Sequence, residues 1–323
     1  MIAVGDEAIK SGEWQAAESS YAQAASLDTN SVAAEIGWAR SLVFQYKALE
    51  AAAHARRAVE LAPREAAAQS TLALALDWAG DVDSAMAAAR RSIDLDPSLS
   101  EGHAFLAEAE ADRYQLADAW RSLDRAIALD PQDEEALRVK GYLYETAGQY
   151  SDAVDAYQQA IAMAPGYSHL YFSLGNALRA LGRPDDAVEK YRKAMSLAPA
   201  DARPRVGMAL IYLSQSDTTA AIPYLEEAAQ LEPGYATAQG QLGTARYFQG
   251  DYDRAREPLE AAIRLEQNHD RLSTYHHVLG WVYVKSDRPD DAEIQFQAAL
   301  SLNPRLDGAR DGLEAVKAVR SRS

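Results

Sequence analysis

Few residues in this chain have the types and spacing that catalysis or metal binding requires. Six histidines and no cysteine are present, which excludes thiolate zinc sites, cysteine nucleophiles and disulfides. The nearest approach to a metal-binding cluster is His269, His276 and His277. Adjacent helical residues point to different faces, and neither H-E-x-x-H nor a comparable spacing occurs. The sequence therefore predicts no metal site and no cofactor.

Two pairs of acidic residues suggest a general acid–base site at first sight. They are Asp185 with Asp186 and Asp290 with Asp291, and each pair directly follows a proline. Proline favours the first turn of a helix, where acidic side chains stabilise the positive end of the helix dipole. No Gly-rich phosphate loop and no G-x-S-x-G elbow accompany them. We therefore expect no catalytic residues, and a protein that is not an enzyme.

Composition narrows the possible partners. The chain has 323 residues, of which 48% are hydrophobic and 25% are charged, so it can bury a sizeable core. Its net charge of −16 disfavours nucleic acid and anionic membranes as partners. No apolar run of about 18 residues is present, and residues 1–10 lack the pattern of a signal peptide. These features predict a soluble chain, cytoplasmic by default.

An internal repeat in the sequence predicts the helices that would position these residues. Prolines recur every 34 residues, at Pro63, Pro97, Pro131, Pro165, Pro199 and Pro233. The register continues to Gln267, and the next proline, Pro304, follows after 37 residues, so about three residues are inserted near 270–272. A fixed period of this length is typical of a solenoid of helical repeats.

Columns of small residues support the repeat. One column is alanine in all nine copies, namely Ala17, Ala51, Ala85, Ala119, Ala153, Ala187, Ala221, Ala255 and Ala292. Another holds only glycine or alanine, namely Gly5, Ala39, Ala73, Ala107, Gly141, Gly175, Ala209, Gly243 and Gly280. Small side chains at a fixed register indicate that two helices approach closely there.

Each copy has the pattern of a helix, a turn and a second helix. In the copy from residue 168, Tyr171, Leu174, Gly175 and Leu178 form the apolar stripe of a helix. Gly182 can end that helix and Pro184 can open the next one. Ala187, Tyr191 and Ala194 continue the stripe until Pro199. No strand pattern is needed anywhere in the chain.

These residues resemble the tetratricopeptide repeat family. Tyr171, Leu174, Gly175, Ala187, Tyr191, Ala194 and Pro199 fit its signature, with Leu178 where tyrosine is commoner. The resemblance covers about residues 1–306 and implies an all-α, right-handed α–α superhelix that binds other proteins. Tyr46 and Tyr114 stand where glycine is usual, so we expect reshaped turns in those two copies.

The repeat boundaries predict one solenoid over residues 1–306. Its copies are 1–31 (truncated), 32–65, 66–99, 100–133, 134–167, 168–201, 202–235, 236–269 and 273–306, and residues 307–323 form a C-terminal capping helix. Met1 falls at the fourth position of its repeat. We therefore expect a chain cut from a longer one, from which a signal, an anchor or a catalytic domain could have been removed. A natural start is the alternative.

The resemblance also implies a concave groove lined by positions 2, 5, 9, 12 and 13 of each first helix. Aromatic and apolar side chains at these positions suggest an interaction surface. The alternative is that several of them merely pack against the next helix. The residues predicted to bind a peptide or partner are Trp78, Arg138, Tyr142, His169, Phe172, Asn176, Arg179, Arg203, Tyr247, Phe248, His277 and Trp281.

Charge varies along this band of first-helix residues. The third and fourth copies contribute Asp77, Glu101, Glu108 and Asp112. The middle is basic through Arg138, Arg179 and Arg203, which predicts a place for a carboxylate or an acidic segment. The alternative is that these arginines form ion pairs within their helices, such as Arg138 with Glu135 or Glu134.

Two ligand modes known in the family are absent. The Lys and Asn residues of a clamp for C-terminal carboxylates do not occur at the required positions, and the asparagine ladder of glycosyltransferase members is missing. The favoured function is a non-enzymatic scaffold that holds a peptide or partner helix, with an acidic segment as one candidate. The alternatives are a self-assembling solenoid, which would be a homo-oligomer, and the regulatory arm of a larger protein.

Overall fold

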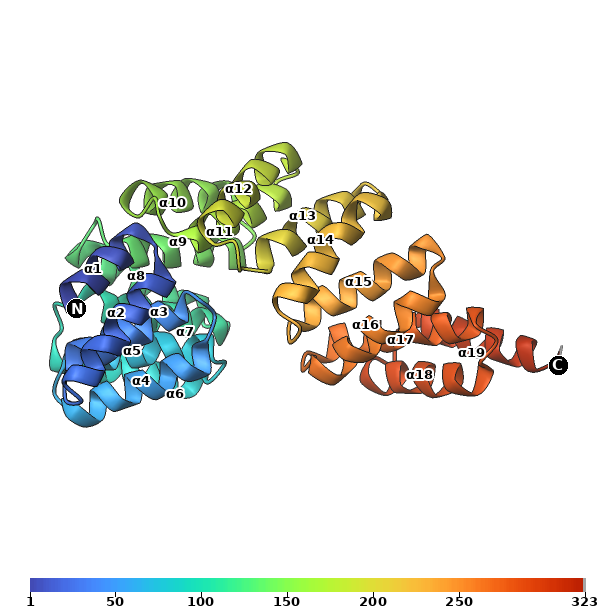
Figure 1. The fold of residues 1–323 in the computed structure, drawn as a ribbon, viewed down its shortest axis with the longest axis horizontal. Coiled ribbons are helices and arrows are strands. Elements are labelled where there is room, and N and C mark those ends of the chain that lie inside the picture. The colour runs from blue at the N-terminus through green and yellow to red at the C-terminus, as the bar shows by residue number, and fades with distance from the viewer. Residues whose placement is uncertain (322–323) are drawn as a thin grey trace. The chain divides into compact units, whose positions relative to one another are not determined.

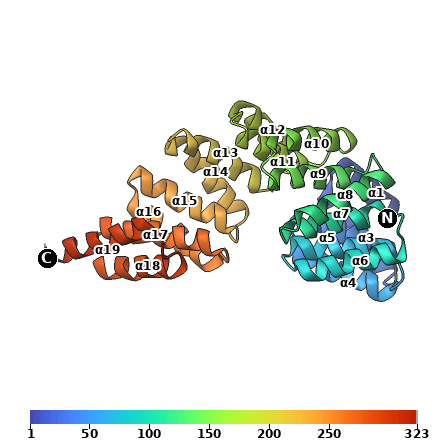
Figure 2. The same ribbon diagram turned by 180° about the vertical axis from the view of Figure 1, so that it is seen from behind.

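The computed structural model describes residues 1–321, and within them nineteen helices and no strand occur (Figure 1). Consecutive helices pack against each other in pairs, with a short turn inside each pair (Figure 2). The all-α repeat fold predicted from the sequence is confirmed. No helix in the described part of the chain combines the length and the hydropathy needed to cross a membrane.

The helices alternate between two positions in the repeat. The first helices of the pairs are α1 (Ile2–Ser11), α3 (Val32–Val43), α5 (Ala66–Trp78), α7 (Ser100–Asp112), α9 (Glu134–Thr146), α11 (Ser168–Ala180), α13 (Arg203–Ser214), α15 (Ala236–Gln249) and α17 (His269–Lys285). The second helices are α2 (Trp14–Leu27), α4 (Ala48–Leu61), α6 (Val82–Leu95), α8 (Leu116–Leu129), α10 (Tyr150–Met163), α12 (Pro184–Leu197), α14 (Thr218–Leu231), α16 (Tyr252–Leu265) and α18 (Pro289–Leu302). A last helix, α19 (Asp307–Arg320), packs on α17 and α18.

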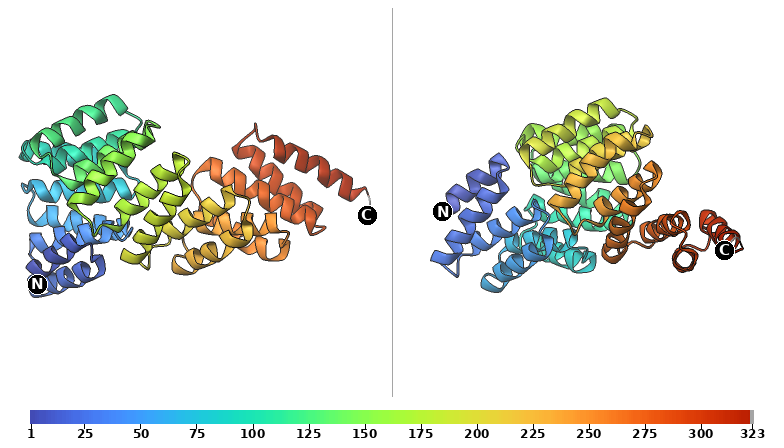
Figure 3. Two further views of the ribbon diagram at one scale, coloured as in Figure 1. Left: turned by 90° about the horizontal axis from the view of Figure 1, so that it is seen from above. Right: turned by 45° about the vertical axis from the view of Figure 1, so that its right-hand side comes forward.

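The chain packs as two compact units. Unit 1 is Met1–Ala198, with α1 to α12, and unit 2 begins at Pro199 and holds α13 to α19. Within each unit the helix pairs stack side by side (Figure 3). That residues 1–306 form one continuous solenoid stays a prediction. The predicted capping segment 307–323 contains α19, and its residues 322–323 lie outside the described part of the chain.

The turns inside the repeats share one backbone conformation. Five of them place a glycine at positive φ, between 72° and 88°. Tyr46 (φ 61°) and Tyr114 (φ 58°) adopt the same left-handed conformation, as do Ser216 and Asp287. The expectation of reshaped turns at the two tyrosines was therefore wrong. The turn keeps its left-handed conformation in these four repeats, although the residue in it is not glycine.

The column of small residues has a steric cause. A Cβ atom on Gly175 would come within 2.6 Å of the Tyr191 ring, and one on Gly141 within 2.5 Å of the Tyr157 ring. Such distances are well inside van der Waals contact, so a glycine on the first helix makes room for an aromatic ring on the second. The inserted residues 270–272 lie in the first turn of α17, which is accordingly 17 residues long.

Unit 1 also closes on itself through two glycines. A Cβ atom on Gly166, in the turn after α10, would lie 2.1 Å from the carbonyl oxygen of Ser11. A Cβ atom on Gly12, in the turn after α1, would lie 2.0 Å from the carbonyl oxygen of Gly166. The two turns touch backbone to backbone, so the first repeat contacts the end of the fifth.

Candidate interaction surfaces

Arg138 of α9 is buried and bonded within the chain. Its Nη1 and Nη2 atoms donate to the two carboxylate oxygens of Glu108, at 2.7 and 2.6 Å, and its Nε donates to Glu135 at 2.7 Å. The side chain of Arg138 is 7% exposed. Its guanidinium therefore does not offer a free receptor for a partner's carboxylate. The alternative considered from the sequence, an ion pair with Glu135, describes this side chain.

His169 is also buried, in an aromatic cluster formed by Trp14, Phe44, Trp78, Tyr167 and His169. Its ring stacks on Phe44, with centroids 4.5 Å apart, and Trp14 packs edge-on against Tyr167 at 4.7 Å. Only 3% of His169 is exposed, and neither ring nitrogen has a hydrogen-bond partner. Burial, together with the nearby charge of Arg138, holds the pKa of His169 well below its usual value. Two members of this cluster, Trp14 and Tyr167, follow closely after Gly12 and Gly166 in the chain.

Trp78 and Tyr142 lie at the edge of this interior and are half-buried. The guanidinium of Arg138 sits 5.6 Å from the centre of the Trp78 ring, and Tyr142 donates its hydroxyl hydrogen to Asp112. Both side chains keep part of their surface in contact with solvent.

An acidic recess adjoins Trp78 and Tyr142, and we define it by Asp77, Glu108 and Asp112. Asp77 and Glu108 are each 6% exposed, whereas Asp112 is exposed. The Oδ1 atom of Asp77 has no hydrogen-bond partner. Burial raises the pKa of Asp77 to about 9, and the negative charges of Glu108 and Asp112 add to the rise while Arg138 opposes it. The recess therefore holds more carboxylates than its one arginine can neutralise.

The remaining predicted residues of unit 1 lie on α11. Phe172 and Asn176 are half-buried, and the Asn176 side-chain oxygen accepts a hydrogen bond of 2.8 Å from the Tyr191 hydroxyl. Arg179 is exposed. Of the three arginines in the predicted basic centre, it alone reaches well into solvent.

Arg203, at the start of α13 in unit 2, has acidic partners. Its Nη1 atom lies 2.8 Å from Asp201 and 3.6 Å from Glu232, and its guanidinium covers the Tyr235 ring at 5.6 Å. Its side chain is 15% exposed. The basic centre predicted from the sequence is thus largely neutralised by acids of the same chain.

Unit 2 carries a pocket formed by α13, α15 and the turn that leads into α14. The pocket has a volume of about 530 Å³ and is lined by Leu213, Ser216, Thr218, Gln241, Thr244 and Phe248. Phe248 is 69% exposed, and the Tyr247 ring packs edge-on against it at 5.3 Å. No charged side chain lines this pocket. We call it the Phe248 pocket.

His277 and Trp281 lie on α17 at the predicted groove positions. The indole Nε1 of Trp281 donates to Nε2 of His277 at 2.9 Å, and the Trp281 ring packs edge-on against Phe296. Both side chains are half-buried. Within residues 1–321, no group of three or more His, Cys, Asp or Glu is arranged to hold a metal ion.

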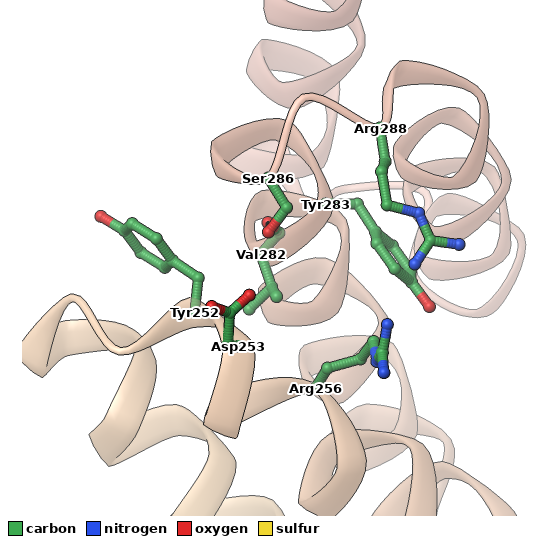
Figure 4. A pocket seen from close by; sticks show the side chains of 7 residues that line it. All are labelled: Tyr252, Asp253, Arg256, Val282, Tyr283, Ser286 and Arg288. Atoms are coloured by element: carbon green, nitrogen blue, oxygen red, sulfur yellow. Dashed lines mark hydrogen bonds between the residues drawn. The ribbon is translucent and has the colours of Figure 1, made fainter.

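A second pocket of unit 2, of about 420 Å³, lies between α16 and the end of α17 (Figure 4). Arg288 covers the Tyr283 ring at 4.6 Å, and Arg256 extends toward the hydroxyl end of that ring. Arg288 is bonded to Asp291, and the Tyr283 hydroxyl donates to Glu260. Arg288 and Tyr283 therefore already have hydrogen-bond partners within the chain.

The twelve residues predicted from the sequence all lie on first helices. Sequence reasoning missed the contacts between distant repeats. Trp14 and Tyr167 fill the interior of unit 1, yet each belongs to a different repeat and neither occupies a predicted groove position. The acidic residues of the third and fourth repeats were visible in the sequence. The burial of Asp77 was not, because it depends on the packing of α5, α7 and α9.

Comparison with protein families gives matches over most of the chain. A tetratricopeptide repeat model matches residues 36–100, 106–168, 139–204 and 172–236, and a second tetratricopeptide repeat model matches 235–305. A comparison with curated proteins gives no match.

Similar solved structures have the same fold. A chain of the APC/C hetero-tetramer Cut9–Hcn1 is 20% identical with a TM-score of 0.77, over 94% of this chain and 59% of that one. PilF of Pseudomonas aeruginosa is 17% identical (TM-score 0.58), over 67% of this chain and 96% of that one. A tetratricopeptide repeat protein from Parabacteroides merdae is 15% identical (TM-score 0.54), over 77% of this chain and 97% of that one.

This chain spans 59% of the length of the Cut9–Hcn1 chain that it matches. At these identities the likeness concerns the fold alone. The family matches, together with the paired helices and their left-handed turns, identify this chain as a member of the tetratricopeptide repeat family.

Proposed function

We propose that this protein is a non-enzymatic interaction scaffold that binds an uncharged, apolar segment of a partner protein in the Phe248 pocket. The family is one of protein-interaction scaffolds, and that general role supports the proposal. The observation that carries the specific part is Phe248, a large aromatic side chain that is 69% exposed at the edge of a pocket without charged lining.

The apolar character of the ligand follows from the lining. Leu213 and Phe248 provide apolar surface, and Gln241, Ser216, Thr218 and Thr244 provide neutral hydrogen-bonding groups. Aromatic side chains are often among the few residues that supply most of the binding energy of an interface. Trp281 and His277 lie on α17, the next first helix. We therefore place the ligand on the first helices of unit 2.

An acidic ligand has less support than it had from the sequence. Arg138 is bonded to Glu108 and Glu135, and Arg203 lies beside Asp201 and Glu232. A partner's carboxylate would have to displace those acids. Arg179 alone offers an exposed charge for it, on α11 of unit 1.

The test is a selection of random peptides displayed on phage against the purified chain. We expect enriched peptides with aromatic or aliphatic residues and no excess of Asp or Glu. Their affinity, measured by fluorescence anisotropy, should fall about tenfold or more in Phe248→Ser, because the exposed aromatic contact is lost.

The matched control is Ile294→Ser, which removes an apolar side chain that is 60% exposed on α18, a second helix. Its affinity for the same peptides should equal that of the unaltered chain. An acidic consensus, equal loss in both variants, or a selection that enriches no peptide would refute the proposed function.

A further inference from the structure

The acidic recess of unit 1 is an unbalanced charge site. Asp77, Glu108 and Asp112 come from α5 and α7, and Arg138 of α9 is paired with Glu108 and acts on Asp77 through its charge. Arg138 is shared with Glu135, a fourth carboxylate, at 2.7 Å. Burying excess negative charge is costly unless protons or cations compensate it. In the absence of a ligand the compensation is a proton, held by Asp77.

The unused hydrogen-bond acceptors of the recess can be identified. Both carboxylate oxygens of Glu108 accept from Arg138, so Glu108 is occupied. Asp77 is 94% buried, since 6% is exposed, and its Oδ1 atom has no partner even though the residue faces Glu108 and Asp112. A buried acceptor without a donor destabilises the chain. Within residues 1–321 the chain itself therefore supplies no hydrogen-bond donor to the Oδ1 atom of Asp77.

One carboxylate of the recess, that of Asp112, belongs to a residue at the solvent-exposed surface. The rings of Trp78 and Tyr142 beside it are half-buried. The guanidinium of Arg138 lies 5.6 Å from the centre of the Trp78 ring, so this ring already takes part in one cation–π contact. A cation that binds here would thus meet the exposed Asp112 before the buried Asp77.

We propose that this recess binds an arginine side chain of a partner protein, with the guanidinium donating to Asp77 and Asp112 and its aliphatic stem packed along Trp78 and Tyr142. A guanidinium presents several N–H donors in one plane and can bridge two carboxylates, whereas an ammonium acts as a point charge. The site lies in unit 1, apart from the Phe248 pocket, and neither proposal depends on the other.

Binding is linked to the protonation of Asp77. The charged groups that act on Asp77 are Glu108 and Asp112 of α7 and Arg138 of α9, and burial raises its pKa to about 9. At neutral pH the unbound recess therefore keeps a proton on Asp77, which a guanidinium must displace. Affinity should rise with pH from about 7 to 9, by up to about tenfold per unit.

The probe is Nα-acetyl-L-arginine methylamide, titrated into the full chain at pH 8. The readout is the NMR signal of the Trp78 indole N–H, assigned by its absence in Trp78→Phe. We expect a saturable shift with the arginine probe and none with the citrulline analogue, which has nearly the same shape without the charge. The lysine analogue should bind more weakly than arginine.

Two variants test the acceptors. Asp77→Asn copies the neutral form of the buried acid and should fold normally, but it should weaken binding about tenfold or more and remove the pH dependence. Asp112→Asn, at the exposed mouth, should weaken binding to a similar extent. The control is Asp155→Asn, which removes one exposed charge from α10 and should leave binding unchanged. Helix content by circular dichroism verifies the fold of each.

Several outcomes would overturn the inference. They are equal binding of arginine and citrulline, equal binding of lysine and arginine, an unchanged affinity in Asp77→Asn, or no shift of the Trp78 signal at any pH. Phe248→Ser should leave this titration unaltered, so failure here and failure of the proposed function can be told apart.

Discussion

Single residues in this chain keep conformations that the repeat imposes. Tyr114 lies in the turn between α7 and α8 at φ 58°, and its side chain is 85% exposed. A left-handed backbone costs an ordinary residue about 1–2 kcal/mol, which glycine avoids. The tyrosine therefore bears a conformational cost that no burial of its own side chain offsets.

Tyr114→Gly should raise the free energy of unfolding by about 0.5–1 kcal/mol, because relief of the strain exceeds the entropy that glycine loses on folding. Urea denaturation followed by circular dichroism measures the change. The reciprocal control is Gly148→Ala, at an equivalent turn where a Cβ atom would meet nothing within 4 Å. It should lower stability by about 1 kcal/mol, and a more stable Gly148→Ala would contradict this explanation.

Sequence patterns predicted the turn positions but not the conformation of Tyr114. Glycine at Gly80 or Gly182 signals a left-handed turn, whereas tyrosine at the same register suggested a departure. The structure retains the turn because the helices on both sides are held by their neighbours. A local preference is overruled here by packing, which the repeat register alone does not reveal.

At the scale of helix pairs, glycine on the first helix in most repeats goes with an aromatic ring on the second, although Gly243 faces Leu259. Gly141 faces Tyr157 and Gly175 faces Tyr191. The corresponding residues in the fourth repeat are Ala107 and Leu123, and both are fully buried. The sequence predicted close helix approach at this column, and the structure supplies the partner that sets the size of each residue.

Gly175→Ala should destabilise the chain by about 1–3 kcal/mol, because its Cβ atom would overlap the Tyr191 ring. Adding Tyr191→Leu, which recreates the Ala107 and Leu123 pairing, should recover part of that loss. A double-mutant cycle from urea denaturation measures the coupling. Additive effects of the two substitutions would show that this contact does not limit the residue size.

At the scale of the whole molecule, the fold class was accessible from the sequence and the interior of unit 1 was not. A 34-residue period needs only local register, so the helices could be predicted one by one. The contacts of Trp14 with Tyr167, and of Gly12 with Gly166, join repeats that are not neighbours in the chain. The same limit applies to the predicted binding residues, since the burial of Arg138 and His169 depends on how several repeats curve together.

Gly166→Ala tests that closure. Its Cβ atom would lie 2.1 Å from the Ser11 carbonyl oxygen, so α1 would have to move away, and we expect a loss of about 1–3 kcal/mol and faster hydrogen exchange in α1. Gly234 is a matched control, because it also stands between a proline and a tyrosine and a Cβ atom there would meet nothing within 4 Å. Gly234→Ala should change stability by less than about 0.5 kcal/mol, and equal effects of the two substitutions would argue against the closure.

The contact between Gly12 and Gly166 also has a mechanical consequence. In an open array of repeats, each copy is held only by its neighbours, so a stretching force peels copies from the ends one after another. In unit 1 the first copy is fastened to the end of the fifth, and the copies between them form a loop that carries little load until that fastening breaks. Stretched by its ends, unit 1 should therefore resist up to a single rupture event and only then lengthen stepwise.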